Sequence, residues 1–306
     1  MSFEIQILGS NAAAPAHGRH HTAQSVRIQN NQYLVDCGEG TQLRMKAFGI
    51  KKNRLSHIFI SHLHGDHYLG LMGLLSTMHL NGRKQAIDLY GPVGLAEIIT
   101  IQLKYSNTRL SYPIHFHELA SEKSVLIMEN EHVTVHTIPL NHRIACNGFL
   151  FREKLKPRKM IKEKLLAASL GVAQINRLKA GEDVLDENGQ LLYAFTDFTL
   201  PPKRSRSYAY CSDTLYDEAI LPIIKGVDLL YHEATFLHDM LDRAQQTHHT
   251  TCKQAATMAK KAAVGQLILG HFSNRYKELL PLLAEARREF PDTVLGEEGL
   301  IFSVQE

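Results

Sequence analysis

Residues 61–67 read Ser61-His62-Leu63-His64-Gly65-Asp66-His67 and directly follow an apolar run at residues 57–60. Three imidazoles and a carboxylate within six residues, at the end of a predicted strand, are typical of a loop that folds around a cation. His62 and His64 can point the same way from an extended loop, while Asp66 and His67, beyond the turn at Gly65, can face a second ion. A solvated histidine-rich turn is the alternative, but this spacing favours a metal-binding loop.

Two ions need more ligands than this loop supplies, and sites in α/β proteins lie at the ends of strands. His142 follows the predicted strand at residues 133–140, Asp213 follows residues 207–211, and His271 follows residues 266–269. A single residue of this kind at a strand end more often caps the strand or forms a hydrogen bond within the core. Together with the loop they complete two ligand sets with positions open for solvent, as in a catalytic metal site.

The hydrophobic pattern predicts a layered α/β fold. Short apolar and β-branched runs predict strands at residues 4–8, 25–28, 33–36, 57–60, 87–90, 133–138, 148–152, 207–211, 227–231, 266–269 and 299–304. Helical spacing predicts helices at residues 70–78, 95–104, 253–263 and 277–290. Strands dominate the early chain, and strand-then-helix units close it. We therefore expect two sheets with helices packed outside them.

Residues 153–206 differ from the rest of the chain. The segment is basic at its start, reads as helical at residues 159–170, and is then rich in turn residues up to the stretch Pro201-Pro202-Lys203-Arg204-Ser205-Arg206. It is too short for much core of its own. We expect one domain, residues 1–306, with residues 153–206 as an inserted basic arm.

The composition of the chain excludes several classes of protein. The chain has 306 residues, 44% of them hydrophobic and 21% charged, which excludes wholesale disorder. The net charge of +3 is too small to indicate nucleic-acid binding by itself. Four cysteines lie far apart without a CxxC pair, which argues against a disulfide scaffold or a thiolate zinc site. No apolar run reaches the ~20 residues of a membrane span, and no signal peptide is evident, so we expect a cytoplasmic protein without a membrane.

The ligand pattern resembles that of the metallo-β-lactamase superfamily. Three further stretches resemble its transfer-RNA 3′-processing branch, ribonuclease Z: Asp36-Cys37-Gly38-Glu39-Gly40-Thr41-Gln42, His232-Glu233-Ala234-Thr235 and His249-Thr250-Thr251. These motifs run in the family's order over nearly the whole chain. The resemblance implies an αββα sandwich, two Zn²⁺ per subunit and a homodimer in which one subunit's arm serves the other's site. Mn²⁺ or Fe²⁺ would also suit these ligand types.

The resemblance also assigns the ligands. His62, His64 and His142 would hold the first zinc, and Asp66, His67 and His271 the second. Asp213 would bridge both ions. Asp36 would orient the metal-binding loop through hydrogen bonds, although a strand-end turn is an equal reading of Asp36 from the sequence alone.

The expected chemistry is hydrolysis of a phosphodiester by metal-generated hydroxide. Asp66 would accept the proton of the attacking water. His249 would protonate the leaving oxygen, and Glu233 would hold the His249 ring and raise its pKa. His248 is a rival for this role by position, and a solvated histidine ahead of a helix N-cap is the structural alternative for His249.

Two regions are expected to contact RNA. The arm offers phosphate contacts through four basic residues, Lys154, Lys156, Arg158 and Lys159, but lacks the Gly-Pro pair often found in the arms of this family. The stretch Pro15-Ala16-His17-Gly18-Arg19-His20 stands where the family has a PxKxRN loop. Arg19 can make a bidentate phosphate contact, whereas His17 would carry charge only part of the time at pH 7.

We therefore expect a zinc-dependent endoribonuclease that removes the 3′ trailer from precursor transfer RNA and leaves a 3′-hydroxyl. A small-molecule phosphodiesterase or arylsulfatase of the same superfamily is the alternative. A metal-stabilised RNA-binding protein without turnover is disfavoured, because every ligand position holds a competent residue. A β-lactamase is disfavoured by the absence of an export signal and by the Asp at the bridging position.

Overall fold

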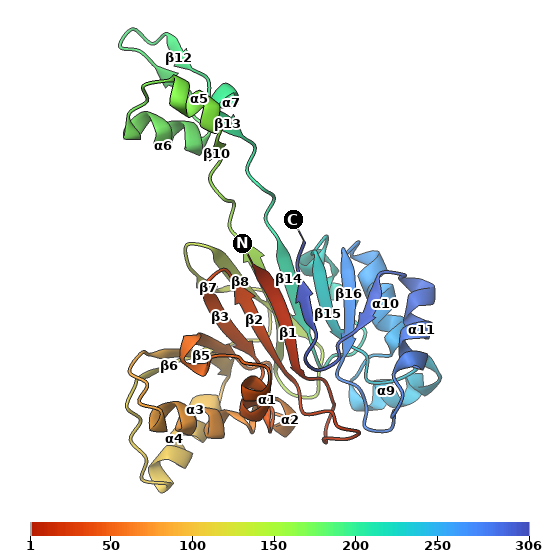
Figure 1. Ribbon diagram of the computed structural model, residues 1–306. Helices are drawn as coiled ribbons and strands as arrows, with labels where there is room; N and C mark the ends of the chain where they lie inside the picture. The colour runs from red at the N-terminus through yellow and green to blue at the C-terminus, as the bar shows by residue number, and fades with distance from the viewer. Residues whose placement is uncertain (1, 306) are drawn as a thin grey trace. The chain divides into compact units, whose positions relative to one another are not determined.

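The computed structural model describes residues 2–305, and two seven-stranded sheets form its centre (Figure 1). The first sheet has the order β18-β1-β2-β3-β4-β5-β6. Its strands are β1 (Phe3–Gly9), β2 (Ala23–Ile28), β3 (Asn31–Val35), β4 (Leu55–Phe59), β5 (Ile87–Pro92), β6 (Ile114–Leu119) and β18 (Ile301–Ser303). Strands β3 to β6 run parallel, so their carboxyl ends lie at one edge.

The second sheet has the order β17-β16-β15-β14-β9-β8-β7. Its strands are β7 (Leu126–Glu129), β8 (Val133–Leu140), β9 (Cys146–Glu153), β14 (Ser207–Cys211), β15 (Leu229–Glu233), β16 (Gln266–Gly270) and β17 (Thr293–Leu295). Strands β14 to β17 are parallel. Every strand predicted from the hydrophobic pattern is present, whereas β6, β7 and β17 were not predicted.

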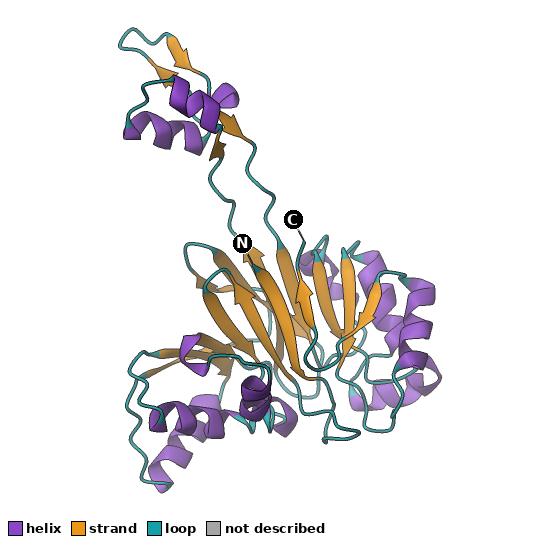
Figure 2. Ribbon diagram, in the orientation of Figure 1, coloured by secondary structure: helices purple, strands orange, loops and turns teal. Residues whose placement is uncertain are grey.

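Helices cover the outer face of each sheet (Figure 2). The first sheet packs against α1 (Thr41–Ala47), α3 (Leu71–Leu80) and α4 (Leu95–Tyr105), and the short α2 (Gly65–Tyr68) lies in the metal-binding loop. The second sheet packs against α10 (Cys252–Lys261) and α11 (Leu280–Glu289), with α8 (Leu221–Ile224) and α9 (Leu241–Thr247) nearby in the chain. Helix α11 begins three residues later than predicted, because Pro281 suits the first turn of a helix.

Three buried clusters correspond to the three interfaces between these layers. Aromatic residues such as Tyr33, Phe59, Phe149 and Tyr208 fill the space between the sheets. Aliphatic side chains dominate the two outer clusters, under α3 and under α10. The predicted α/β sandwich with helices outside the sheets is therefore confirmed. Among residues 2–305, no helix combines the length and the apolar character that a membrane span requires.

The chain divides into two compact units, and residues 153–206 form the second. This arm contains β10 (Lys159–Met160), α5 (Lys162–Ala167), α6 (Val172–Ala180), β11 (Val184–Leu185), β12 (Leu191–Tyr193), α7 (Phe195–Phe198) and β13 (Thr199–Leu200). The helix predicted at residues 159–170 is shorter at both ends. It begins later because the backbone of Lys159 and Met160 pairs with β13, and it ends at Ala167 because Ala168 is extended. The turn-rich stretch predicted after residue 170 contains the helix α6, which was not predicted from the sequence, and α6 buries only Leu178.

Candidate metal centre

Four side chains from three strand ends converge on one point. His62 and His64 follow β4, His142 follows β8, and Asp213 follows β14. His62 Nε2 and His142 Nε2 lie 3.0 and 3.2 Å from His64 Nδ1. Asp213 Oδ2 lies 3.6 Å from His62 Nε2 and 3.7 Å from His142 Nε2. This group is the set expected for a first cation.

A second group shares Asp213. His67 Nε2 and His271 Nε2 lie 3.2 and 3.1 Å from Asp213 Oδ1, and 3.3 Å from each other. Asp66 Oδ2 lies 3.6 Å from the His67 nitrogen and 3.5 Å from the His271 nitrogen. One oxygen of Asp213 therefore faces each group, which is the arrangement of a bridging carboxylate.

The donor set fits divalent cations. Ligands around a zinc ion, at ~2.0–2.1 Å from the metal, lie about 3.3 Å from one another in a tetrahedron. The imidazole nitrogens have this mutual spacing, and lone pairs that face one another repel unless a cation or proton lies between them. His62, His67, Asp213 and His271 are almost fully buried, so water cannot screen that repulsion.

The electrostatics of the centre favour the metal-binding states of most ligands. Burial lowers the pKa of His142 to about 4 and holds the pKa of His62 well below its usual value, which leaves both rings neutral. Burial opposes ionisation of Asp213, but the neighbouring histidines hold its pKa well below the usual range. His67 differs: despite its burial, the surrounding carboxylates raise its pKa well above the usual value. Without a cation, a proton on His67 balances the negative charge of these carboxylates. A bound cation would balance the same charge.

Asp36 holds the metal-binding loop in place through hydrogen bonds. Its Oδ1 accepts from the Ser61 amide at 2.7 Å, and its Oδ2 accepts from Ser61 Oγ at 2.9 Å and from His67 Nδ1 at 2.8 Å. Tyr210 Oη donates to the same Oδ2 at 2.5 Å. These bonds turn His67 Nε2 toward the ligand group, as expected for a carboxylate that orients a metal-binding histidine.

The stretch that follows Asp36 also supports this loop. The Cys37 amide donates to the His67 carbonyl at 2.7 Å, and the Gly70 amide donates to the Cys37 carbonyl at 2.9 Å. A Cβ at residue 38 would lie 2.4 Å from the Asp66 carbonyl oxygen, so only glycine allows this approach.

His249 and Glu233 form a pair beside the ligands. His249 Nδ1 donates to Glu233 Oε1 at 2.9 Å, which leaves Nε2 directed away from the carboxylate. Burial favours the neutral ring, but the charge and hydrogen bond of Glu233 raise the pKa of His249 to about 9. Glu233 also accepts from the Thr214 amide and from Thr235 Oγ1. His248 instead accepts His142 Nδ1–H with its backbone carbonyl at 2.9 Å.

The expected RNA-contact residues near the N-terminus are already engaged. His17 Nε2 lies 2.8 Å from the Asn274 carbonyl. Arg19 donates from Nε to Asn11 Oδ1 at 2.9 Å and from Nη2 to the Tyr276 carbonyl at 2.5 Å. Both side chains thus bind protein carbonyl groups in this structure.

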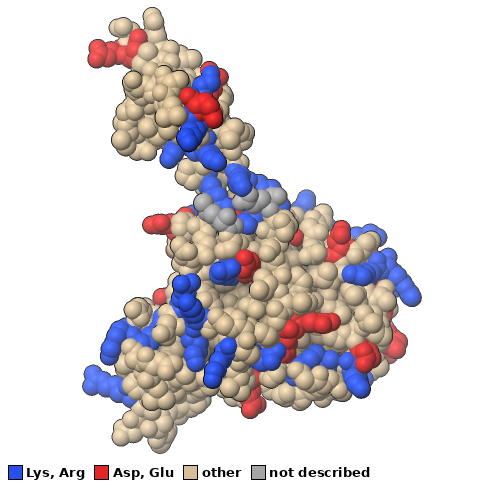
Figure 3. Space-filling model, viewed as in Figure 1, with Lys and Arg blue, Asp and Glu red and all other residues tan. Residues whose placement is uncertain are grey.

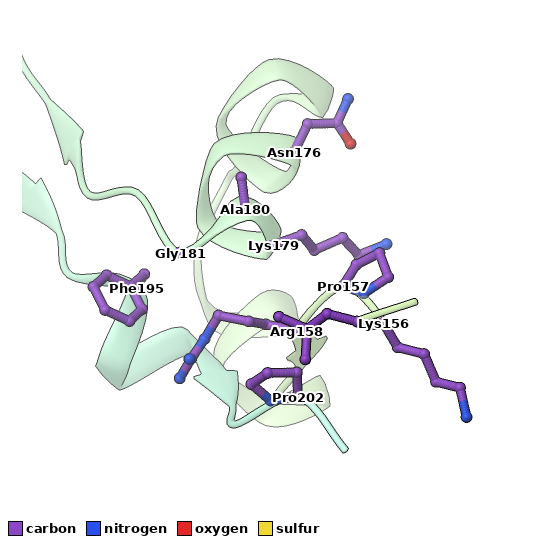
Figure 4. Close-up of a pocket in the computed structure, with 10 residues that line it drawn as sticks. Lys156, Pro157, Arg158, Asn176, Lys179, Ala180, Gly181, Phe195 and Pro202 are labelled. Carbon is purple, nitrogen blue, oxygen red and sulfur yellow. The ribbon is translucent and has the colours of Figure 1, made fainter. Parts of the chain in front are cut away.

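Two of the four expected contacts in the arm border a cavity of about 690 Å³ (Figure 4). Lys156 and Arg158 line it together with Lys179 from α6. Arg158 stacks over the Phe195 ring at 4.7 Å and donates to Thr199 Oγ1 at 2.7 Å. Lys159 is exposed and Lys154 is half-buried. Figure 3 shows Lys and Arg side chains gathered around the two segments at the base of the arm.

Three further contributors to the centre were not found from the sequence. Tyr210 lies in a strand that reads as ordinary core, and its contact with Asp36 depends on the packing of the two sheets. The Ala13 amide donates to Asp66 Oδ2 at 2.7 Å, and a backbone amide leaves no signal in a sequence. Arg143 lines the cavity of about 360 Å³ over the ligands, and its place directly after His142 was an available signal.

Comparison with known proteins identifies the relatives of this chain. Residues 3–156 match the model of the family described as Anti-Pycsar protein Apyc1. A ribonuclease Z of Cytophaga hutchinsonii is 52% identical over 306 residues, which cover 100% of this chain and 97% of that protein.

Solved structures agree with this relationship. The crystal structure of human tRNase Z, short form, is 28% identical and matches with a TM-score of 0.72 over 99% of this chain and 100% of its own. The metallo-β-lactamase fold protein YhfI of Bacillus subtilis is 16% identical, with a TM-score of 0.69 over 98% of each chain, and shows the fold alone. With a metallo-β-lactamase fold and a relative of this identity over its full length, the chain belongs to the ribonuclease Z family.

Proposed function

We propose that this protein is a metal-dependent endoribonuclease that removes the 3′ trailer from precursor transfer RNA and leaves a 3′-hydroxyl on the product. The observation that carries the proposal is the bridging position of Asp213 between two ligand groups, in a chain 52% identical to a ribonuclease Z. Each group combines imidazole nitrogens with a carboxylate, the ligand types of hydrolytic two-metal sites.

The proposed cofactor is two Zn²⁺ per subunit, with Mn²⁺ or Fe²⁺ as other ions these ligands accept. His62, His64 and His142 would hold one ion, Asp66, His67 and His271 the other, and Asp213 both. When bound, two such ions lower the pKa of a shared water and neutralise charge on a phosphate group. Asp36 would keep His67 in its binding orientation through the hydrogen bond to Nδ1.

The protein's own side chains would move the protons. Asp66, at the mouth of the centre, would accept a proton from the attacking water. His249 would donate from Nε2 to the leaving 3′-oxygen of the transfer RNA, because its Nδ1–H is already committed to Glu233. Glu233 would keep the ring protonated and oriented, which its burial and its bonds to Thr214 and Thr235 make possible.

The arm would supply affinity for the body of the transfer RNA. We propose that residues 153–206 are an inserted substrate-binding arm within one catalytic domain, residues 1–306. Lys154, Lys156, Arg158 and Lys159 would contact phosphates, joined by Lys179 on the border of the same cavity. His17 and Arg19 could reach RNA only by giving up their present carbonyl partners.

The proposed assembly is a homodimer in the cytoplasm. Leu43 in α1, Leu69 directly after α2 and Val93 just before α4 are exposed apolar side chains that a second copy could cover. The four buried, unpaired cysteines fit a reducing compartment.

Cleavage of one labelled precursor transfer RNA, with mapping of both product ends, tests the function. We expect a single cut at the 3′ side of the mature sequence, loss of cleavage with a chelator, and loss of cleavage by Asp213→Ala. Bis(p-nitrophenyl) phosphate serves as a second substrate. Hydrolysis of this small diester by an enzyme that leaves the precursor intact would instead support the small-molecule phosphodiesterase.

A further inference from the structure

Arg19 is half-buried, and its side chain bonds to the protein on several sides. Its guanidinium donates to three acceptors: Asn11 Oδ1 at 2.9 Å, the Tyr276 carbonyl at 2.5 Å and the Lys277 carbonyl at 3.3 Å. The first acceptor lies in the loop after β1, and the other two lie a few residues beyond the ligand His271. Arg19 therefore clamps the loop at residues 10–14 to the segment at residues 271–277.

The loop at residues 10–14 bonds to segments that carry two ligands of the second group, His271 and Asp66. The Ala12 amide donates to the Phe272 carbonyl at 2.9 Å, and the Phe272 amide donates to the Ser10 carbonyl at 2.8 Å. These bonds fix the residue next to His271. One residue further along the loop, the Ala13 amide donates to Asp66 Oδ2 at 2.7 Å.

Asn11 connects Arg19 to that amide. The Asn11 side chain is fully buried, accepts from Arg19 with its Oδ1, and donates from Nδ2 to the Ala14 carbonyl at 2.5 Å. It thereby closes a tight turn around Ala13, whose φ of 58° is unusual for a residue with a side chain. Such a backbone conformation persists only where surrounding contacts hold it.

We propose that Arg19 is a positioning residue, which acts through Asn11 and the Ala13 amide to hold Asp66 and His271 in the geometry of the second cation site. The inference rests on the proposed function, because it concerns the metal centre of that activity. It differs from the expected role of Arg19 as a phosphate contact. Each of the three guanidinium nitrogens already donates to a protein oxygen, so three of the five N–H groups serve the protein and not a phosphate.

The test measures metal affinity and two kinds of turnover in Arg19→Ala and Asn11→Ala. Chelator competition with Zn²⁺ should show two ions bound to the wild type, and a loss of about 10–100-fold in affinity for one of them in each variant. Turnover of a precursor transfer RNA and of bis(p-nitrophenyl) phosphate should fall by similar factors, mainly in kcat. Arg19→Lys, which keeps a donor near Asn11, should recover part of the affinity.

Arg27→Ala is the matched control, because Arg27 lies on the exposed face of β2 and pairs with Glu4. Circular dichroism and melting temperatures show whether each variant is folded. Unchanged affinity for both ions in the folded variants would overturn the proposal. So would an Arg19→Ala defect confined to the RNA substrate, with a raised KM and a shallower salt dependence, since that result identifies a phosphate contact.

The two substrates separate this inference from the proposed function. If the wild type hydrolyses the small diester but not the precursor, the proposed function fails, while the metal affinities still decide the role of Arg19. If the wild type cleaves the precursor and the variants keep both ions, the proposed function stands and the role assigned to Arg19 fails.

Discussion

At the level of single residues, the Glu233–His249 pair determines which pH range the proposed proton donor can serve. Glu233 has no exposed surface and bonds His249 at 2.9 Å. Burial alone would favour a neutral imidazole, but the carboxylate raises the pKa of His249 to about 9. His249 is therefore protonated at neutral pH, as a proton donor must be.

The variant Glu233→Gln keeps an acceptor for His249 and removes the negative charge. A donor works only while protonated, so the rate falls as pH rises through the pKa of His249. Without the carboxylate that pKa falls, and the alkaline limb of the kcat profile should move to lower pH by about 1–3 units. Profiles from pH 6 to 10 check this, with the exposed Glu218→Gln as control. An unmoved limb would mean that another group donates the proton.

The residue types at the centre were predictable from the sequence, but their hydrogen bonds were not. Spacing after strand ends is enough to predict His62, Asp213 and His271 as ligands, because the parallel strands of each sheet have their carboxyl ends at one edge. Tyr210 and the Ala13 amide act across contacts between distant segments, and no local pattern encodes such contacts. For the same reason no local pattern predicts the hydrogen bond from Arg19 to Asn11.

At the level of helices and strands, predictions held where an element has one clearly apolar face. Helix α10 and strand β8 are examples, since α10 buries one face and β8 alternates buried and half-buried residues at its start. The edge strand β6 was missed because its side chains are only partly buried and include His115, His117 and Glu118. Helix α6 was missed because it buries Leu178 alone. A short element with a single buried side chain leaves too weak a pattern to read.

The arm has little core of its own, and a buried ion pair closes its base. Glu153 and Arg206 close its base with two hydrogen bonds of 2.8 Å between guanidinium and carboxylate, both almost fully buried. Burial opposes the charge of Glu153, but Arg206 lowers its pKa, so the pair remains ionised at neutral pH. Lys159 and Lys179, beyond this closure, are exposed to solvent, where phosphates can reach them.

Replacing Lys159 and Lys179 together with alanine should weaken RNA binding without affecting the metal centre. For each phosphate that the variant no longer binds, the slope of log KM against log salt should become shallower by about 0.7–0.9. KM for a precursor transfer RNA should rise severalfold at low salt, and turnover of bis(p-nitrophenyl) phosphate should not change. The pair Lys51→Ala and Lys260→Ala, two exposed lysines outside the arm, is the control. Equal salt slopes for the wild type and both double variants would show that Lys159 and Lys179 do not contact phosphates.

At the level of the whole catalytic unit, the centre joins the two sheets. The loop after β4 in the first sheet supplies His62, His64, Asp66 and His67. The second sheet supplies His142, Asp213 and His271 from the ends of β8, β14 and β16. Bound cations would therefore cross-link layers that otherwise meet mainly through the aromatic core and the Asp36–Tyr210 contact.

Metal removal should consequently lower the stability of the entire sandwich. When the free cation concentration is 100 times the Kd of a site, binding adds about 2.7 kcal/mol to the free energy of unfolding. For a chain of this size, that corresponds to a rise in Tm of about 4 °C per site. Calorimetric scans with Zn²⁺ and with a chelator measure the difference. Asp213→Ala removes the ligand common to both groups and should abolish most of it, whereas Asp292→Ala, an exposed carboxylate beyond α11, should retain it. If the chelator left the wild-type Tm unchanged, the ligand groups would not act as a cation site that links the sheets.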